Sequence, residues 1–229
     1  MKNANSTEPH APASLTRGKI AFSIGLCLLP QLAGIFCLSS MPAQIPIHFN
    51  FQGTPDNWIS SSLFFFGFPW MFVAADAFCL GTTFFSKKGS AQSPSIENLL
   101  LLTIPFIELI VYIGILLFMN TDAFRITTWI SGLIGLLLVI LGNLMPKARQ
   151  NSYFGFRTQS TLSSKSVWQK TNRAAGYALT LLGVLTIFAA FTYNEVLMFA
   201  LLIGGSLLVT MGLSIYAHRL ADRESQKTE

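Results

Sequence analysis

The stretch LLLLTIPFIELIVYIGILLFM, residues 99–119, decides the fold class of this chain. It contains a single charged residue, Glu108, and it has the roughly 20 residues that a helix needs to cross the hydrocarbon core of a bilayer. In hydrocarbon, every backbone donor and acceptor needs a partner within the protein, so such a stretch must be helical. We therefore expect a transmembrane helix over these residues.

Five further stretches are similarly long and apolar, and they cover residues 20–38, 63–85, 126–145, 174–193 and 196–217. The chain of 229 residues is 52% hydrophobic and only 11% charged, whereas soluble domains carry about 25% charged residues. This composition excludes an ordinary soluble enzyme, a disordered protein and a fibrous repeat. The sequence predicts an all-α integral membrane protein with six transmembrane helices.

The basic residues predict the orientation of these helices. Every Lys and Arg except Arg125 falls in the two tails or in the connections after the second and fourth apolar stretches. Because cytoplasmic segments are enriched in Lys and Arg, both termini are expected in the cytoplasm. The net charge of +5 is then an orientation signal, and no nucleic-acid partner is expected, since no basic face is interleaved with aromatic residues.

The first apolar stretch also resembles a signal peptide, because Arg17 and Lys19 precede it. Its length exceeds that of a usual signal core, and Pro30 and Gln31 interrupt it, so we expect it to remain in the protein. The predicted segments are a disordered cytoplasmic tail (1–19), the first helix pair with its outer connection (20–85), a cytoplasmic loop (86–98), the second helix pair (99–145), a motif-rich loop with the last helix pair (146–217) and a cytoplasmic tail (218–229).

The connection between the first two helices is expected on the outer face. Ile45, Ile47, Phe49 and Phe51 alternate with other residues, which is the periodicity of a strand, and GTPD at 53–56 is typical of a turn. A tryptophan directly before a span anchors chains at membrane interfaces. The candidate residues of this outer motif are Pro46, His48, Asn50, Gly53, Pro55, Asp56 and Trp58.

Three interpretations of His48 remain open. With Asn50 and Asp56 it forms a weak set of metal ligands, but a zinc site needs a second His or Cys nearby, so we expect no metal. The second interpretation is a histidine that hydrogen-bonds within a folded loop. The third is a protonatable sensor on the outer face.

The connection between the fourth and fifth helices, residues 142–177, combines turn formers, aromatic residues and six basic residues. Pro146 ends the fourth helix, and Ser163 or Ser164 is expected to cap a helix that continues into the fifth span. The basic residues would each contribute on the order of 1 kcal/mol at an anionic membrane surface and so orient the protein. The alternative function is a docking surface for a cytosolic regulator.

Two carboxylates lie inside the predicted helices, Asp76 in the second and Glu108 in the third, and Gln31 lies at a similar depth in the first. Each charge costs roughly 2.5 kcal/mol or more at this depth, and no Lys or Arg lies within a span. We expect at least one carboxyl to be uncharged and hydrogen-bonded to the other or to Gln31. Pro105 and Pro69 each free a backbone carbonyl nearby. A polar clamp between helices and a proton or cation site both remain open.

Enzyme chemistry is not expected, because no hydrolase, kinase or redox motif is present. The three cysteines, Cys27, Cys37 and Cys79, lie in apolar stretches and form no disulfide framework. No cofactor is expected.

Two strings carry a resemblance to a known family. The inner string GNLMPKARQNSYFGFRTQSTLSSKSVWQKTNRAAGY (142–177) resembles the signature of the SdpI family of bacterial toxin-immunity membrane proteins. The outer string MPAQIPIHFNFQGTPDNW (41–58) is similar to the small domain of unknown function that often precedes it. The inner positions that match are Asn143, Asn151, Gly155, Arg157, Thr158, Trp168, Asn172, Arg173 and Gly176.

The resemblance implies a multi-pass protein of the bacterial cytoplasmic membrane that protects its host against a membrane-active peptide toxin. Membrane lipids, a peptide toxin at the outer face and a cytosolic regulator at the inner loop are the partners that it implies. The alternatives are a proton- or cation-coupled transporter and a signalling protein. Gln150 and Gln159 stand where the family often has proline, and Asn172 where histidine is frequent.

Overall fold

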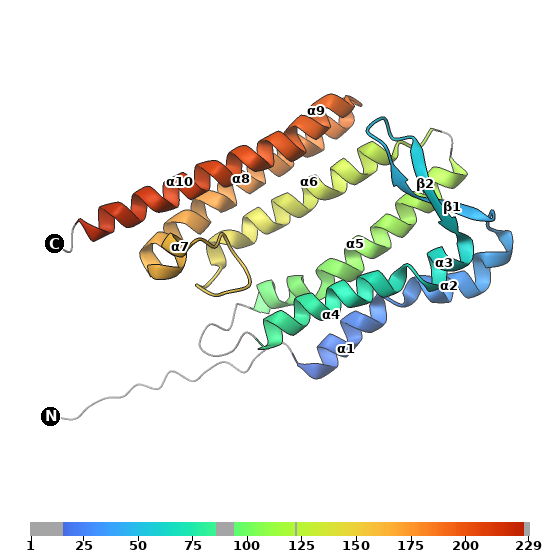
Figure 1. The fold of residues 1–229 in the computed structure, drawn as a ribbon, viewed down its shortest axis with the longest axis horizontal. Coiled ribbons are helices and arrows are strands. Elements are labelled where there is room, and N and C mark those ends of the chain that lie inside the picture. The colour runs from blue at the N-terminus through green and yellow to red at the C-terminus, as the bar shows by residue number, and fades with distance from the viewer. Residues whose placement is uncertain (1–15, 86–93, 122, 227–229) are drawn as a thin grey trace.

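The computed structural model describes residues 16–85, 94–121 and 123–226, and it is mostly helical (Figure 1). Six helical segments are long and apolar enough to cross a membrane, as predicted. They are Arg17–Ser40, Ser61–Thr83, Ser95–Asn120, Ile126–Lys147, Lys165–Phe191 and Glu195–Ser225. Residues 1–15, predicted to belong to a disordered tail, and most of the predicted loop 86–98 lie outside the described residues.

Three of these spans are interrupted. The first contains α1 (Arg17–Leu26), α2 (Leu29–Cys37) and a 3₁₀ turn (Leu38–Ser40). The second contains α3 (Ser61–Phe66) and α4 (Pro69–Phe85), and the sixth contains α9 (Glu195–Phe199), a π-helix (Ala200–Gly205) and α10 (Ser206–Ser225). The others are α5 (Pro94–Asn120), α6 (Ile126–Leu144) with a 3₁₀ turn (Met145–Lys147), and α8 (Lys165–Phe191), which the short α7 (Gln159–Ser163) precedes.

Side chains from neighbouring spans supply donors at the break between α3 and α4. The Tyr112 hydroxyl donates to the carbonyl of Phe64 at 2.5 Å, and Gln31 Nε2 donates to the carbonyl of Phe66 at 3.3 Å. A backbone carbonyl without a hydrogen-bond partner costs roughly several kcal/mol in hydrocarbon. These two side-chain donors therefore allow the helix to break within the span.

The described residues also contain two strands, where the sequence predicts a short extended segment and a turn within a mostly helical protein. Strands β1 (Gln44–Phe49) and β2 (Pro55–Ser60) form an antiparallel hairpin in which Ile45 lies opposite Ile59. The alternation that begins at Ile45 correctly predicted an extended segment, but the strand ends at Phe49 and Phe51 lies in the turn. The sequence PDNWIS of β2 lacks such alternation, which is why the second strand was not predicted.

The helices form two groups that meet between α5 and α6. Helices α1 to α5 pack together, and α8 packs between α6 and α10 (Figure 1). The α6–α8 contact is close because glycines face backbone: a Cβ atom at Gly142 would lie 2.8 Å from the carbonyl oxygen of Gly176. The hairpin lies at one end of the molecule, and α7 and the end of α10 lie at the other (Figure 1).

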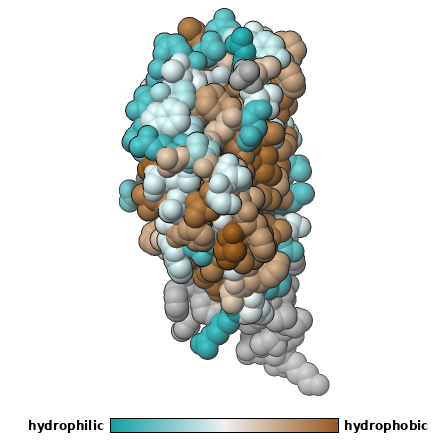
Figure 2. Space-filling view, turned by 90° about the vertical axis from the view of Figure 1, so that its right-hand side faces the viewer, coloured by the Kyte–Doolittle hydropathy of each residue, from teal (hydrophilic) through white to brown (hydrophobic). Residues whose placement is uncertain are grey.

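The two largest clusters of buried side chains lie near the two ends of the molecule. Ile45, Phe64, Phe65, Tyr112 and Ile115 pack beneath the hairpin, and Ile96, Leu144, Ala148, Phe154 and Trp168 pack at the opposite end. Large apolar side chains on the outside of the spans are exposed by more than 70%, including Phe36, Phe78, Phe188 and Leu208. These surfaces are expected to contact lipid. Figure 2, which faces the hairpin end, shows hydrophilic residues in its upper and left parts and hydrophobic residues over much of the rest.

Candidate functional site

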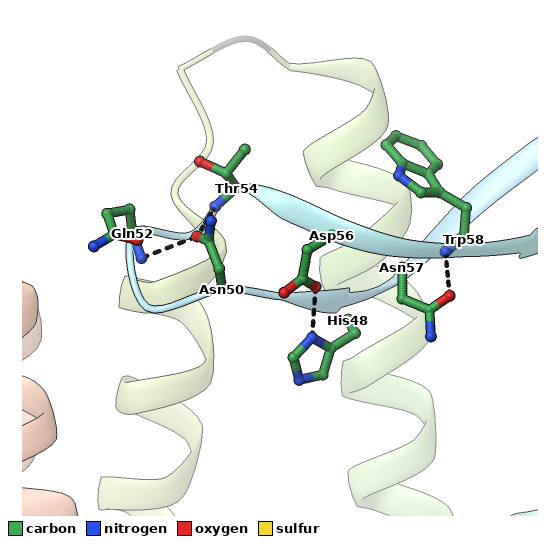
Figure 3. Close-up of polar contacts among 7 residues, drawn as sticks. All are labelled: His48, Asn50, Gln52, Thr54, Asp56, Asn57 and Trp58. Atoms are coloured by element: carbon green, nitrogen blue, oxygen red, sulfur yellow. Dashed lines mark hydrogen bonds and ion pairs between the residues drawn. The ribbon is translucent and has the colours of Figure 1, made fainter.

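The outer motif is the β-hairpin, and its tip is held by Asn50. Asn50 Oδ1 accepts hydrogen bonds from the backbone of Gln52 at 3.0 Å and of Thr54 at 2.9 Å (Figure 3). Gly53 has φ +76°, a conformation that glycine adopts without strain, and a Cβ there would lie 3.0 Å from Thr127 Cγ2 on α6. The turn thus lies at residues 50–54 and not at the predicted 53–56, because Pro55 and Asp56 already belong to β2. It positions the tip against the second group of helices.

His48 and Asp56 face each other across the two strands (Figure 3). His48 Nδ1 lies 2.5 Å from Asp56 Oδ1, and their side chains are 67% and 42% exposed. Among the described residues no group of three His, Cys, Asp or Glu could hold a metal ion. The geometry fits the interpretation in which His48 hydrogen-bonds within the loop. Both side chains remain exposed on the surface of the hairpin.

Aromatic residues connect the hairpin to both groups of helices. Phe49 meets Phe118 of α5 edge to face, with ring centroids 4.9 Å apart. Phe51 lies 4.6 Å from Phe199 of α9, measured between ring centroids. Trp58, opposite Pro46 in the sheet, is 47% exposed, and Pro55 begins β2. The hairpin thus packs across the ends of helices from both groups.

At the other end, Trp168 organises the inner motif. It is 1% exposed, and its Nε1 donates to the carbonyl of Ala148 at 2.8 Å. Asn172, one turn later, accepts from the backbone of Phe156 at 2.8 Å and donates to the carbonyl of Trp168 at 3.1 Å. Gly155 has φ +116°, and a Cβ there would lie 2.8 Å from both Asn172 Oδ1 and Trp168 Cζ2. No residue other than glycine fits this position.

The loop between α6 and α7 is closed by local hydrogen bonds. Asn151 donates to the carbonyls of Arg149 and Phe154 and accepts from the backbone of Tyr153 and Phe154, so all of its polar atoms are used within the loop. The Arg157 guanidinium donates to the carbonyl of Ser152.

Side chains also define the two ends of α7. Thr158 caps its start, accepting from the backbone of Thr161 at 3.2 Å. Gln150, which stands where the resembling family often has proline, donates to the carbonyls of Thr161 and Leu162 at 2.9 and 2.8 Å. Gln150 therefore holds the loop against α7 through hydrogen bonds, whereas a proline at this position would restrict the loop through its rigid ring.

The basic side chains of the inner motif border an open groove. The groove has a volume of about 520 Å³, and its charged lining residues are Lys147, Arg149, Lys165 and Arg173. Ser164 caps α8, as predicted, and its hydroxyl also donates to Glu224 on α10 at 2.6 Å. Asn143 and Gly176 border a separate cavity of about 460 Å³ beside α6 and α8.

The three intramembrane polar residues do not hydrogen-bond to one another as expected, although Asp76 lies close enough to Glu108 to interact with it electrostatically. Gln31 is bonded to the carbonyl of Phe66, as described above. Asp76 is fully buried, and its Oδ2 lies 2.8 Å from the hydroxyl of Ser23. The Ser23 hydroxyl also lies 2.5 Å from the carbonyl of Leu101, the acceptor that Pro105 deprives of its helical donor. Asp76 therefore belongs to a polar clamp that joins α1, α4 and α5.

Glu108 differs from Asp76. It is 1% exposed, and neither of its carboxyl oxygens has a hydrogen-bond partner among the described residues. It lines a groove beside the break between α1 and α2. Sequence reasoning did not identify Ser23, although Pro105 pointed to the carbonyl that Ser23 reaches.

Comparisons with known proteins match both motifs. Residues 147–217 match the SdpI/YfhL protein family, and residues 25–73 match a domain of unknown function, DUF1648. The chain is 28% identical over 202 residues to the immunity protein SdpI of Bacillus subtilis strain 168, covering 86% of this chain and 94% of that protein. No solved structure matches the chain.

Proposed function

Because this chain belongs to the SdpI/YfhL protein family through residues 147–217, we propose that it is an immunity protein of the bacterial cytoplasmic membrane. It protects its host against a membrane-active peptide toxin, by a non-enzymatic mechanism. The observation that carries the proposal is the match to an immunity protein along nearly the full length of that protein. The match includes both the hairpin and the inner loop rather than apolar helices alone.

In this proposal the hairpin faces the exterior and the inner motif faces the cytoplasm. Support comes from the basic residues, which gather at the end of the molecule opposite the hairpin. With six spans both termini lie on the same side of the membrane, and the proposed orientation makes that side the cytoplasm.

The hairpin makes the first contact with the toxin. Its exposed Trp58 and Phe51 offer apolar surface for a hydrophobic peptide, and the exposed His48–Asp56 pair offers polar contacts beside it. The peptide then stays on the immunity protein and does not insert productively into the bilayer. The inner-motif residues Arg157 and Trp168 keep the cytoplasmic loop in shape.

The test is survival of a toxin-sensitive bacterium that expresses this chain, after exposure to membrane-active peptides of the kind that related producers secrete. Protection is expected from the intact chain and not from a variant that lacks the hairpin tip but still reaches the membrane. Equal killing with and without the chain, across a panel of such peptides, contradicts the proposal.

Two other candidate functions have specific support. The cationic groove of the inner motif suits an acidic segment of a cytosolic regulator, and a pulldown with residues 147–173 against the purified candidate tests this. The buried Glu108 suits proton or cation coupling, and flux into liposomes that Glu108→Gln abolishes tests that. The immunity proposal is preferred because it accounts for both matched segments.

A further inference from the structure

A groove of about 170 Å³ lies against the break between α1 and α2. Its lining is apolar except for one side chain, Glu108, and the other lining residues are Leu26, Leu29, Pro30, Leu102, Pro105, Phe106 and Leu109. A cavity of roughly 150 Å³ accommodates a molecule of the size of benzene. The groove is therefore large enough for a short apolar chain and its end group.

The Glu108 carboxyl has no strong hydrogen-bond donor among the described residues. Asp76 uses Ser23, and Gln31 uses the carbonyl of Phe66. The Cys27 thiol interacts with Glu108, but a thiol is only a weak donor, and neither carboxyl oxygen has a partner that meets hydrogen-bond geometry. Buried carboxyl groups in proteins are almost always hydrogen-bonded, and an orphaned one indicates a partner from outside the chain.

The groove contains acceptors and no side-chain donor. Glu108 is its only polar side chain, and Pro30, another lining residue, has no N–H to donate. The described residues also hold no group of three metal-binding side chains. An occupant must therefore bring hydrogen-bond donors, and a primary ammonium group brings three together with a complementary charge.

The groove opens toward the lipid. Leu29, Leu102, Phe106 and Leu109 are each 45% exposed on the outside of the bundle, within segments that span the membrane. A ligand that reaches Glu108 by this route must be soluble in hydrocarbon along most of its length. The lining thus selects for an apolar chain, and Glu108 selects for its end group.

We propose that this groove binds a primary amino group carried on an apolar chain within the membrane, with Glu108 as its partner. The natural occupant is the amino group of a membrane-inserted peptide, and that identification rests on the proposed immunity function. The binding chemistry itself does not depend on it.

The test uses the full chain in phosphatidylcholine nanodiscs and an alkylamine that carries a photoreactive diazirine in its chain. An alcohol of the same chain length, with the diazirine in the same place, is the matched probe without charge. After irradiation, adducts are located by peptide mass spectrometry. Amine adducts are expected to concentrate on Leu102, Phe106 and Leu109, about tenfold over the alcohol, because the charged hydrogen bond is lost with the alcohol.

Two variants separate the carboxyl from the groove. Glu108→Gln is expected to reduce amine labelling to the level of the alcohol, and Leu102→Trp, which fills the rim, is expected to reduce labelling by both probes. Glu97→Gln, the same change earlier on α5, is the control and should label as wild type does.

Equal amine labelling in wild type and Glu108→Gln, or adducts spread evenly over all lipid-facing helices, would overturn the proposal. The result is independent of survival assays. If the chain protects its host but does not prefer the amine, the proposed function stands and this binding site is rejected. If the chain prefers the amine but does not protect its host, the binding site stands and the proposed function is rejected.

Discussion

Ser23 and Asp76 lie in contact in the middle of the bundle, with Ser23 Oγ 2.8 Å from Asp76 Oδ2, although 53 positions separate them in the chain. The same Oγ lies 2.5 Å from the carbonyl of Leu101, which can only accept a hydrogen bond. A hydroxyl has one proton. When Ser23 gives that proton to Leu101, the contact with Asp76 is completed by a proton on the carboxyl, so the clamp works without a negative charge.

This arrangement predicts that Asp76→Asn leaves stability nearly unchanged, because an amide also donates to Ser23. Asp76→Ala and Ser23→Ala each leave a buried polar group without a partner and are expected to lower the free energy of unfolding by about 1–3 kcal/mol. Unfolding of the purified variants in mixed detergent micelles measures the difference. If Asp76→Asn is as damaging as Asp76→Ala, the clamp requires the charged carboxylate.

The position of Gly155 predicts a second destabilised variant. Gly155→Ala places a Cβ 2.8 Å from both Asn172 Oδ1 and Trp168 Cζ2 at φ +116°. A loss of about 1–3 kcal/mol is expected from backbone strain alone. Gly204→Ala is the matched control, because nothing lies within 4 Å of a Cβ there. The measurement is thermal unfolding followed by tryptophan fluorescence, and equal melting of the two variants contradicts the geometry.

The proposed orientation predicts which residues an impermeant maleimide reaches. In a chain without its three cysteines, Gln52→Cys at the exposed hairpin tip is expected to react in intact spheroplasts. Gln169→Cys, which is exposed beside the inner groove, is expected to react only after lysis. The reverse pattern would place the hairpin in the cytoplasm and remove it as the toxin-contacting surface.

The hairpin predicts a loss of protection without a loss of stability. His48 and Asp56 are exposed, and exposed ion pairs contribute only about 0–1 kcal/mol. Asp56→Asn is therefore expected to fold normally and to lower survival in the toxin assay, because it removes a charge from the proposed contact surface. Ser163→Ala, on the opposite end of the molecule, serves as the reference, and the comparison is made at equal amounts of protein in the membrane. Undiminished survival with Asp56→Asn would show that the His48–Asp56 pair has only a structural role in the hairpin.

Sequence patterns predicted the six spans, because hydrophobic length is a strong local signal. They also predicted an extended segment from Ile45 and a cap at Ser163 or Ser164, of which Ser164 is the cap; each of these depends on a few neighbouring residues. The hydrogen-bond partners of buried polar groups were harder to predict from the sequence. Asp76, Glu108 and Gln31 were expected to meet at mid-depth, with a carboxyl bonded to the other carboxyl or to Gln31. Helix breaks and rotations instead decide which side chains hydrogen-bond.

The sequence showed that Pro105 frees a carbonyl, but not that Ser23, far away in the chain, supplies the missing donor. The second strand was missed for a similar reason. Residues 55–60 adopt strand geometry because β1 lies beside them and not because of their own composition.

The contact between Phe51 and Phe199 joins the segment that matches DUF1648 to the segment that matches the SdpI/YfhL family. Chimeras that exchange either segment between relatives would pair surfaces that did not arise together. The two segments are thus expected to be inherited as a matched set, with compensating changes at these two rings.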